Sequence, residues 1–386
     1  MKILIVLTYY RPHISGLTIY AERLAKAFAA LGHHVTILTS QFEKSLPREE
    51  VIEGIRIIRA PVLFRLSKGV IMPTFGWLAS KLASQTDVIQ LHLPQFDAAG
   101  ISLRGRLLKK PTVITYHCDL LLPPGLFNRA ANMAVSFMNW LTAIFTHRIV
   151  TYTRDYAENS KYLNQRLHKV QIIPPPVVLP ETTPTLIREF TNIHNPENKK
   201  PVIGMAARFA TEKGVEVLLK ALPKILERYP NALVQFVGPY QNIVGEEDYF
   251  QRLARQIKGF EQSGNWQFLG SLNPDRMAAL FPNLDVLVLP SLNSTEAFGL
   301  VQIEAMMNGV PCVASALPGV RQPVMTHKMG KVFTIGDAKA LADSILEVLD
   351  QKASFGIPQV DFSMYSPEKV AREYEHLFEQ IKEELH

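Results

Sequence analysis

The chain has 386 residues, of which 47% are apolar and 20% are charged, and its formal net charge is +6. This composition is typical of a globular protein and excludes a disordered or fibrous chain, while the length predicts two domains. Residues 1–180 hold 21 Lys and Arg against 10 Asp and Glu, whereas residues 181–386 carry a net charge of −5. Unless this is an ordinary surface asymmetry, the basic half predicts an anionic partner: a membrane surface, a phosphorylated acceptor or nucleic acid.

Cysteine usage and hydropathy bear on the compartment. Cys118 and Cys312 are far apart, and neither has Cys or His neighbours at zinc-ligand spacing, so we expect a reduced, cytoplasmic setting without structural zinc. The opening MKILIVLTYYRP has too short an apolar core for a signal peptide, and no apolar run approaches the roughly 20 residues of a membrane span.

The first half of the chain alternates apolar runs with helical patterns. Residues 18–32 carry apolar side chains at helical spacing and stop at Gly32. Continuous or β-branched apolar runs predict parallel strands at residues 2–10, 33–40, 55–60, 87–93, 112–117 and 148–153. This order predicts a doubly wound parallel sheet.

The pattern restarts after a proline-dense segment. Residues 174–184, PPPVVLPETTP, cannot sustain a helix or a central strand and are expected to be the linker between domains. Strands are then predicted at residues 201–208, 232–238, 266–270, 286–291 and 310–315, and helices at 215–230, 300–309 and 366–386. We therefore predict an α/β protein with two Rossmann-like domains, residues 1–175 and 176–365, facing each other across a cleft.

The segment STEAFGLVQIEAMMNG places two acids around a helix that should begin near Gly299. The first-turn amides of Leu300 and Val301 would be unpaired at the positive end of the helix dipole, which suits a phosphate. Glu304, one turn deeper, could accept two hydroxyl hydrogen bonds from a ribose, and Glu296 precedes the helix where a sugar would lie. The alternative is that the acids only complement the helix dipole.

A second cluster, AARFATEKG, follows a predicted strand and carries Arg208 and Lys213 in one loop. Together these cations could neutralise the diphosphate leaving group of a nucleotide-sugar, although a pair of solvated surface cations is the alternative. No Asp-x-Asp at a strand end offers oxygen ligands for Mg²⁺ or Mn²⁺, so fixed cations would replace the metal.

These motifs carry a family resemblance. AARFATEKGVEVLLKAL, PSLNSTEAFGLVQIEAMMNGVPCVAS with ALPGVRQPV, and PHISGLTIYAERLAKAFAALGHHVTIL resemble retaining glycosyltransferases of family four, which are group 1 enzymes with the GT-B fold. The resemblance implies a UDP- or GDP-sugar donor in the C-terminal domain, no cofactor and no metal, and helix 366–386 packed back on the N-terminal domain. It assigns Arg208, Lys213, Leu300 and Val301 to the diphosphate, Glu304 to the ribose, and Glu296, Phe298 and Gly299 to the donor sugar.

Three positions of the first half are expected to contribute, and the resemblance singles out two of them, His117 and Gly16. His117, at the end of a predicted strand, would lie beside the transferred sugar and contact it through its side chain or its main chain, unless it is a buried structural histidine. Asp119 would touch the acceptor. Gly16 would approach the diphosphate, although the usual glycine pair is here Ser15-Gly16 followed by Leu17.

No side chain is an obvious nucleophile for a double displacement. The resemblance places His117 and Glu296 in the catalytic centre, where Glu296 is expected to bind rather than attack. The acceptor hydroxyl would attack on the face from which the diphosphate departs and pass its proton to a phosphate oxygen, with retention at the anomeric carbon. Closure of the domains would exclude water.

Two stretches bear on the acceptor. Residues 64–84 mix Phe64, Phe75 and Trp77 with Arg65, Lys68 and Lys81, and the segment between Asp119 and His147 has Arg129 as its single charge. Each stretch is either core or a membrane-interface element. Together with the basic half, they favour a lipid-linked or otherwise anionic acceptor and peripheral association with the cytoplasmic membrane face.

Three other functions remain open. A nucleotide-sugar epimerase or phosphorylase would share this architecture. An NAD(P)-dependent oxidoreductase is disfavoured because no G-x-G-x-x-G follows the first strand. A non-catalytic membrane or nucleic-acid binder would use only the basic half, but no aromatic-and-basic nucleic-acid module is visible.

Overall fold

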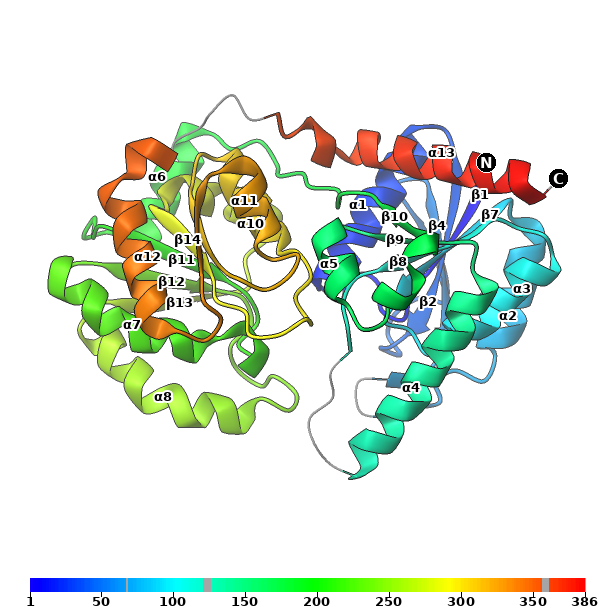
Figure 1. Cartoon of the computed structure of the whole chain (residues 1–386), viewed down its shortest axis with the longest axis horizontal. Helices are drawn as coiled ribbons and strands as arrows, with labels where there is room; N and C mark the ends of the chain where they lie inside the picture. The colour runs from blue at the N-terminus through cyan, green and yellow to red at the C-terminus, as the bar shows by residue number, and fades with distance from the viewer. Residues whose placement is uncertain (67–68, 121–125, 356–360, 386) are drawn as a thin grey trace. The chain divides into compact units, whose positions relative to one another are not determined.

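The computed structural model describes residues 1–66, 69–120, 126–355 and 361–385. The chain forms two compact units (Figure 1): unit 1 comprises Met1–Val177 and Ser363–His386, and unit 2 comprises Val178–Phe362. The chain therefore leaves the first unit in the middle of the proline-dense segment and returns to it for its last helix. Residues 173–183, all described, contain neither helix nor strand, as their prolines predict.

The described part of unit 1 contains an eight-stranded sheet of order β10-β9-β8-β7-β1-β2-β4-β3. All neighbouring strands are parallel except β3, which runs antiparallel to β4 at the edge. Its strands are β1 (Lys2–Val6), β2 (His34–Gln41), β3 (Glu49–Ile52), β4 (Ile55–Pro61), β7 (Val88–Leu93), β8 (Thr112–Tyr116), β9 (Arg148–Thr151) and β10 (Val170–Ile172). A separate hairpin joins β5 (Phe64–Leu66) to β6 (Gly69–Ile71).

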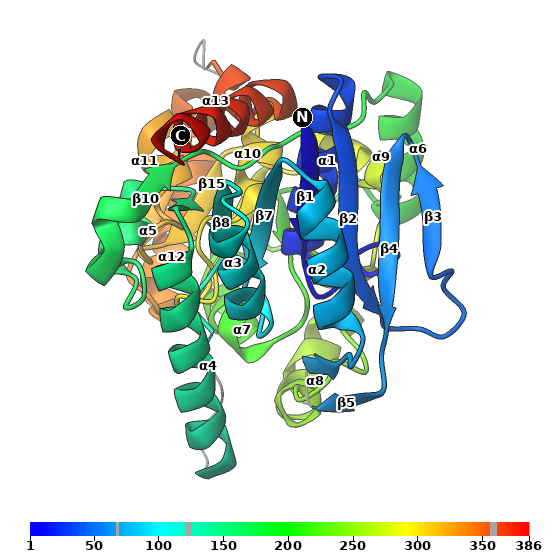
Figure 2. The same ribbon diagram turned by 90° about the vertical axis from the view of Figure 1, so that its right-hand side faces the viewer.

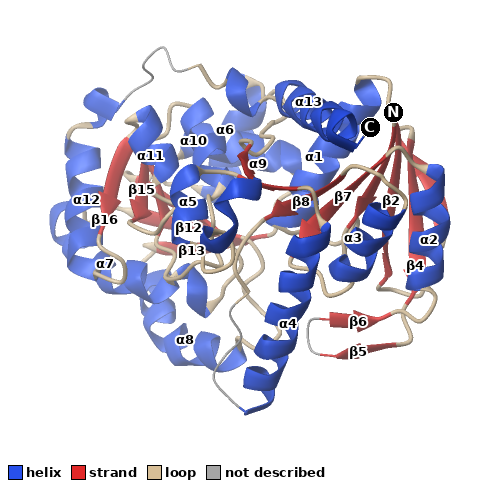
Figure 3. Cartoon of the chain, turned by 45° about the vertical axis from the view of Figure 1, so that its right-hand side comes forward, coloured by secondary structure: helices blue, strands red, loops and turns tan. Residues whose placement is uncertain are grey.

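Helices cover this sheet in two groups. α1 (Gly16–Ala30) packs against α13 (Pro367–Leu385), whereas α2 (Phe75–Gln85), α3 (Ala98–Leu107) and α4 (Leu126–Phe145) pack side by side in a second layer (Figures 2 and 3). Right-handed crossovers place the helices on either side of β1 on opposite faces of the sheet. Shorter helices complete the unit: α5 (Arg154–Asn159) and the 3₁₀ turns η1 (Asn164–Lys169) and η5 (Ser363–Tyr365).

In its described residues, unit 2 contains a six-stranded, fully parallel sheet of order β13-β12-β11-β14-β15-β16. The strands are β11 (Val202–Ala206), β12 (Leu233–Val237), β13 (Trp266–Gly270), β14 (Val286–Leu289), β15 (Cys312–Ser315) and β16 (Gly330–Phe333). In both sheets the strand order reverses beside the first strand, between β1 and β7 and between β11 and β14. In open α/β sheets, ligands bind at the carboxyl ends of the strands at such a reversal.

The helices of unit 2 bury a core on both sides of the sheet. α7 (Val215–Arg228) packs against α12 (Ala338–Asp350), and α6 (Pro184–His194) packs against α9 (Pro274–Leu280). The remaining elements are α8 (Glu247–Gln262), α10 (Leu300–Met307), α11 (Gln322–His327), η2 (Thr211–Lys213), η3 (Phe281–Asn283) and η4 (Lys352–Phe355). The core is dominated by fully buried aliphatic and aromatic side chains such as Phe209, Leu222 and Phe236.

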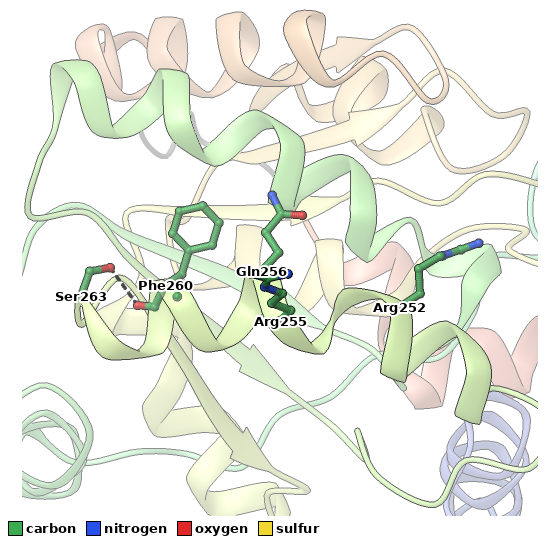
Figure 4. A pocket seen from close by; sticks show the side chains of 6 residues that line it. Arg252, Arg255, Gln256, Phe260 and Ser263 are labelled. Carbon is green, nitrogen blue, oxygen red and sulfur yellow. Dashed lines mark hydrogen bonds between the residues drawn. The ribbon is translucent and has the colours of Figure 1, made fainter.

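α7 continues through Pro223, as the predicted helix over residues 215–230 requires. Pro223 has no N–H to donate to the Leu219 carbonyl, but the Gln256 side chain of α8 donates to that oxygen at 3.4 Å. Gln256 also lines a shallow hollow over α8 with Arg252, Arg255, Gly259, Phe260 and Ser263 (Figure 4). The residues that line this hollow all belong to α8 or follow it directly, so it is not at the carboxyl ends of the strands.

Each strand and helix predicted from the sequence is present, with ends shifted by a few residues. The pattern of residues 64–84 is resolved into the β5–β6 hairpin and α2, and Phe75 is 3% exposed, so it is a core residue rather than part of an interface. Phe64 and Trp77 are exposed. Lys68 lies outside the described residues, as does the side chain of Arg129.

Candidate functional site

Two loops of unit 2 meet at the carboxyl ends of the adjacent strands β11 and β14. The main-chain N–H of Leu292, after β14, donates to the carbonyl of Glu212, after β11, at 2.9 Å. Gly214 adopts a φ of +70°, and a Cβ at this position would lie 2.0 Å from the Pro290 carbonyl oxygen. The glycine is therefore required both by its backbone conformation and by the close approach of the second loop.

Charged side chains from these two loops form ion pairs. Lys213 Nζ donates to Glu296 Oε2 at 2.6 Å, and both side chains are mostly buried, at 16% and 19% exposure. Arg208 pairs with Glu212 on its own loop and is more exposed. The structure thus brings together Arg208, Lys213 and Glu296 at the point where the strand order reverses.

The start of α10 completes this group. Gly299 is its N-cap residue, with a φ of +79°, and a Cβ would lie 2.3 Å from a Leu289 methyl carbon. The glycine is thus demanded by the fold of unit 2 itself. Because glycine has no side chain to cap the helix, the first-turn amides of Leu300 and Val301 stay available to an anion. Gln302 holds the preceding loop by donating to the carbonyls of Phe298 and Val320, at 2.8 and 2.9 Å.

Two further residues expected in the donor site are buried. Glu304 lies on the second turn of α10 with 8% of its surface exposed. Phe298 is 4% exposed, and its carbonyl oxygen accepts the hydrogen bond from Gln302, so its side chain belongs to the core and its carbonyl holds the loop before α10.

In unit 1, Gly16 is the first residue of α1, directly after the N-cap. Ser15 caps the helix, since its Oγ accepts a hydrogen bond from the Thr18 N–H at 3.2 Å. Gly16 is exposed, and a Cβ placed there meets no atom within 4 Å. The fold of unit 1 therefore does not demand glycine at this position, and the space above it is open.

His117 follows β8 and is 7% exposed. Its Nε2 is hydrogen-bonded to Nδ1 of His92 at 2.8 Å, and its Nδ1 is hydrogen-bonded to the Tyr152 hydroxyl. Burial lowers the pKa of His92 to about 3, and burial beside His92 holds the pKa of His117 well below its usual range. Both rings are therefore neutral at pH 7. The His117 main-chain N–H donates to the Leu93 carbonyl at 3.1 Å, so the main-chain carbonyl is the part of His117 that can meet a ligand.

Asp119 is held by three neighbours. Its Oδ1 accepts hydrogen bonds from the Tyr116 hydroxyl at 2.8 Å and the Ser160 hydroxyl at 2.7 Å, and its N–H donates to the Tyr156 hydroxyl at 2.7 Å. These bonds give Asp119 a role in shaping the loop after β8, independent of any acceptor.

Sequence reasoning missed the residues that contact the His117 ring, His92, Tyr152 and Tyr20, and it missed Tyr374, which is hydrogen-bonded to Tyr20 and Thr115. One signal could have revealed the first. In the strand VIQLHL, which is buried throughout, Gln90 and His92 are polar residues two positions apart, so they share one face of the sheet. A buried polar pair of this kind needs hydrogen-bond partners nearby.

Neither a metal-ligand cluster nor a membrane-spanning helix is found among the residues that the structure describes. Within the described ranges, no group of three or more His, Cys, Asp or Glu side chains is placed to hold a metal ion. Of the helices that the structure describes, none combines the length and apolar character that crossing a bilayer requires.

Two family models match the chain. The model for glycosyl transferases group 1 matches residues 187–367, and that for glycosyltransferase family 4 matches residues 14–179. An uncharacterised glycosyltransferase of Methanocaldococcus jannaschii is 27% identical over 351 residues, covering 86% of this chain and 85% of the relative. Phosphatidyl-myo-inositol mannosyltransferase of Mycolicibacterium smegmatis is 22% identical over 387 residues, with coverages of 97% and 94%.

Solved structures with a similar fold cover nearly the whole chain. Anabaena HepE in complex with UDP-glucose matches with a TM-score of 0.73 at 20% identity, covering 100% of this chain and 99% of that one. WaaG, a glycosyltransferase involved in lipopolysaccharide biosynthesis, matches with a TM-score of 0.66 at 17% identity, covering 99% and 98%. The family models and these structural matches lead to one conclusion: the chain belongs to the group 1 glycosyltransferases and has the GT-B fold.

Proposed function

We propose that this protein is a retaining, metal-independent glycosyltransferase that moves a hexose from a UDP- or GDP-sugar to the hydroxyl of a lipid-linked or otherwise anionic acceptor. In this proposal unit 2 holds the donor and the carboxyl edge of the unit 1 sheet holds the acceptor. The observation that carries the proposal is the ion pair of Lys213 with Glu296 beside the α10 N-terminus, which has no capping side chain.

The donor side rests on complementary charge. A diphosphate needs cations and N–H donors, and Arg208, Lys213 and the first-turn amides of α10 supply both at one strand reversal. Glu304, one turn deeper, takes the ribose hydroxyls, and Glu296 takes hydroxyls of the sugar. A UDP donor is favoured by the HepE complexes, which contain UDP or UDP-glucose.

The proposed step needs only groups that the chain and its two substrates provide. The bond between the anomeric carbon and the diphosphate oxygen breaks, while the acceptor oxygen bonds to the same face of that carbon. Configuration is retained because the new bond forms on the face from which the diphosphate departs, and the acceptor proton passes to the departing phosphate oxygen. Lys213, Arg208 and the α10 amides stabilise the negative charge that develops on the diphosphate.

The proposed acceptor follows from the surface of unit 1. Helices α2, α3 and α4 lie side by side (Figure 2), and they carry exposed apolar and aromatic side chains: Trp77, Leu103, Leu107, Phe137, Trp140 and Ile144. The same layer carries several cations: Lys81, Arg104, Arg106, Lys109 and Lys110. Aromatic and basic side chains together suit the interface of an anionic, cytoplasmic membrane face, and the related mannosyltransferase is named for a phosphatidylinositol acceptor.

A donor screen tests the proposal. The melting temperature of the purified protein is first measured in the presence of each of several UDP- and GDP-sugars. The donor that stabilises the protein most is then radiolabelled in its sugar and incubated with the protein. This transfer assay is run with and without a membrane lipid extract, and again with EDTA. Without the extract we expect only slow hydrolysis of the donor. With the extract we expect transfer of the labelled sugar to lipid, and EDTA should not change the rate. Interconversion of donors without an acceptor would instead identify an epimerase. The nucleotide should no longer raise the melting temperature of Glu304→Ala, whereas it should still do so in the control Glu261→Ala, an exposed position on α8. That result would show that the ribose binds at Glu304.

A further inference from the structure

A buried hydrogen-bond network surrounds His117, and it draws residues from both ends of the chain. His92 lies on β7, Tyr152 follows β9, Tyr20 is on α1 and Tyr374 is on α13. All five side chains are at most 8% exposed. The sheet order places β7, β8 and β9 next to one another, so the three residues near their carboxyl ends meet although they are far apart in sequence.

The protons in this network can be assigned from its partners. Two neutral imidazoles carry one N–H each. His92 Nε2 is buried and has no hydrogen-bond partner in the part of the chain that the structure describes. An orphaned buried N–H is rarer than an orphaned acceptor, so the proton of His92 lies on Nδ1 and is donated to His117 Nε2. The proton of His117 then lies on Nδ1 and is donated to the Tyr152 oxygen.

The aromatic ring of Tyr20 and the hydroxyl of Tyr374 extend the network to the last helix. The Tyr20 ring meets the His117 ring edge-on, with centroids 5.0 Å apart at 89°. The hydroxyl oxygens of Tyr20 and Tyr374 are 2.8 Å apart, and that of Tyr374 is 2.7 Å from Thr115 Oγ1, two residues before His117. Gln90 completes the chain by donating to Thr115 at 3.1 Å.

We propose that His92 and Tyr374 are positioning residues of the transfer reaction: His92 locks the His117 ring in its Nδ1–H form, Tyr374 anchors Thr115 and the Tyr20 ring that packs on the His117 ring, and together they hold the His117 main-chain carbonyl where the transferred sugar is bound. The inference rests on the proposed function, because it assigns His117 to that sugar. It makes α13, the last helix of the chain, part of the catalytic apparatus rather than only a cover over α1. The reaction should therefore be sensitive to side chains that touch no substrate.

Two polar replacements of His92 separate hydrogen bonding from packing. The amide nitrogen of His92→Asn lies near the position of Nδ1 and can still donate to His117. The longer His92→Gln places its amide near Nε2, where it cannot. We expect His92→Gln to lower kcat at least tenfold with KM for the donor within threefold of wild type, and His92→Asn to keep kcat within threefold. UDP and GDP affinities should be unchanged in both, since the proposed nucleotide site lies in unit 2.

The ring of His117 provides a readout that a merely structural role would not move. In NMR spectra of protein labelled with ¹⁵N-histidine, we expect His117 to carry its proton on Nδ1 and to have an unprotonated Nε2 in the wild type and in His92→Asn. In His92→Gln we expect a mixture of the two tautomers of His117. Wild-type kcat in His92→Gln, or equal losses in both variants with an unchanged His117 signal, would overturn the proposal. If the wild type transfers no sugar at all, the proposed function fails, while the tautomer assignment is still decided by the spectra.

Tyr374→Phe tests the contribution of α13 to the reaction. It also provides a second test of the proposal, which is needed if His92→Gln does not fold. It removes the hydroxyl bonded to Tyr20 and Thr115 but keeps the ring that packs on Phe28 and Phe378. We expect a several-fold lower kcat. The matched control is Tyr162→Phe, which removes a hydroxyl bonded to the Asn139 carbonyl outside the network and should leave kcat unchanged. Equal kcat in both tyrosine variants would remove α13 from the catalytic apparatus.

Discussion

Lys213 and Glu296 form an ion pair between two loops that leave adjacent strands of the unit 2 sheet, with 2.6 Å between Nζ and Oε2. In the absence of a donor the acid neutralises the cation, so neither charge is left unpaired in this mostly buried position. A diphosphate and a sugar hydroxyl together can replace this contact, because one is an anion for Lys213 and the other a donor for Glu296.

Replacing either cation should impair the reaction. We expect Lys213→Ala and Arg208→Ala each to lower kcat/KM at least tenfold, which corresponds to about 1.4 kcal/mol of transition-state stabilisation. Steady-state kinetics with the best donor measure this. Lys220→Ala, an exposed lysine on α7, is the matched control and should behave as the wild type. Near-normal turnover in the Lys213 variant would show that the diphosphate lies elsewhere.

Gly16 offers a test in which folding and binding are separable. Because a Cβ at Gly16 meets no protein atom within 4 Å, Gly16→Val should leave the melting temperature within about two degrees of wild type. If the diphosphate approaches this helix start, the added side chain should raise KM for the donor or lower kcat by an order of magnitude or more. Gly259→Ala on α8, which is equally uncrowded, serves as the control. Full activity in Gly16→Val would exclude close approach of the donor.

The α2–α3–α4 layer should bind anionic membranes. We expect the protein to float with vesicles that contain phosphatidylglycerol but not with pure phosphatidylcholine, and to be released by high salt because basic side chains contribute. The double variant Phe137→Ser and Trp140→Ser should lose binding without losing the fold. Met325 is an exposed apolar residue of α11 in unit 2, and the control variant Met325→Ser should still bind the vesicles. Failure of the wild type to float with anionic vesicles would refute the membrane proposal.

The buried histidines make stability depend on pH in a defined direction. The pKa of His92 is lowered from an ordinary value of 6.5 to about 3. Between these two pH values the side chain is therefore protonated in the unfolded chain but not in the folded chain. Its stabilising contribution is thus complete above pH 6.5 and is lost as the pH falls from 6.5 toward 3, at a slope approaching 1.4 kcal/mol per pH unit, as an order of magnitude. The urea midpoint should therefore fall more steeply between pH 7 and pH 5 in wild type than in His92→Asn. Equal slopes would mean that His92 is protonated in the folded chain.

Much of the fold could be predicted from local pattern. Continuous apolar runs such as residues 2–6 and 286–289 specify buried parallel strands, and the glycines at 214 and 299 mark positive-φ positions ahead of α7 and α10. The motifs also placed Arg208, Lys213 and Glu296 after strands, where ligand loops begin. These features depend on side-chain periodicity and backbone conformation, which are encoded within a few residues.

Only the tertiary structure decided which of these residues meet. Nothing in the local pattern pairs Lys213 with Glu296, His92 with His117, or Tyr374 with Thr115, because each pair depends on the order of strands in a sheet or on a helix returning after unit 2. The sequence by itself determined the elements and the residue types at their ends. The packing of β11 beside β14, and of β7 beside β8, decided that Lys213 is paired and that the ring of His117 is occupied, since hydrogen bonds and ion pairs form between neighbours in space rather than along the chain.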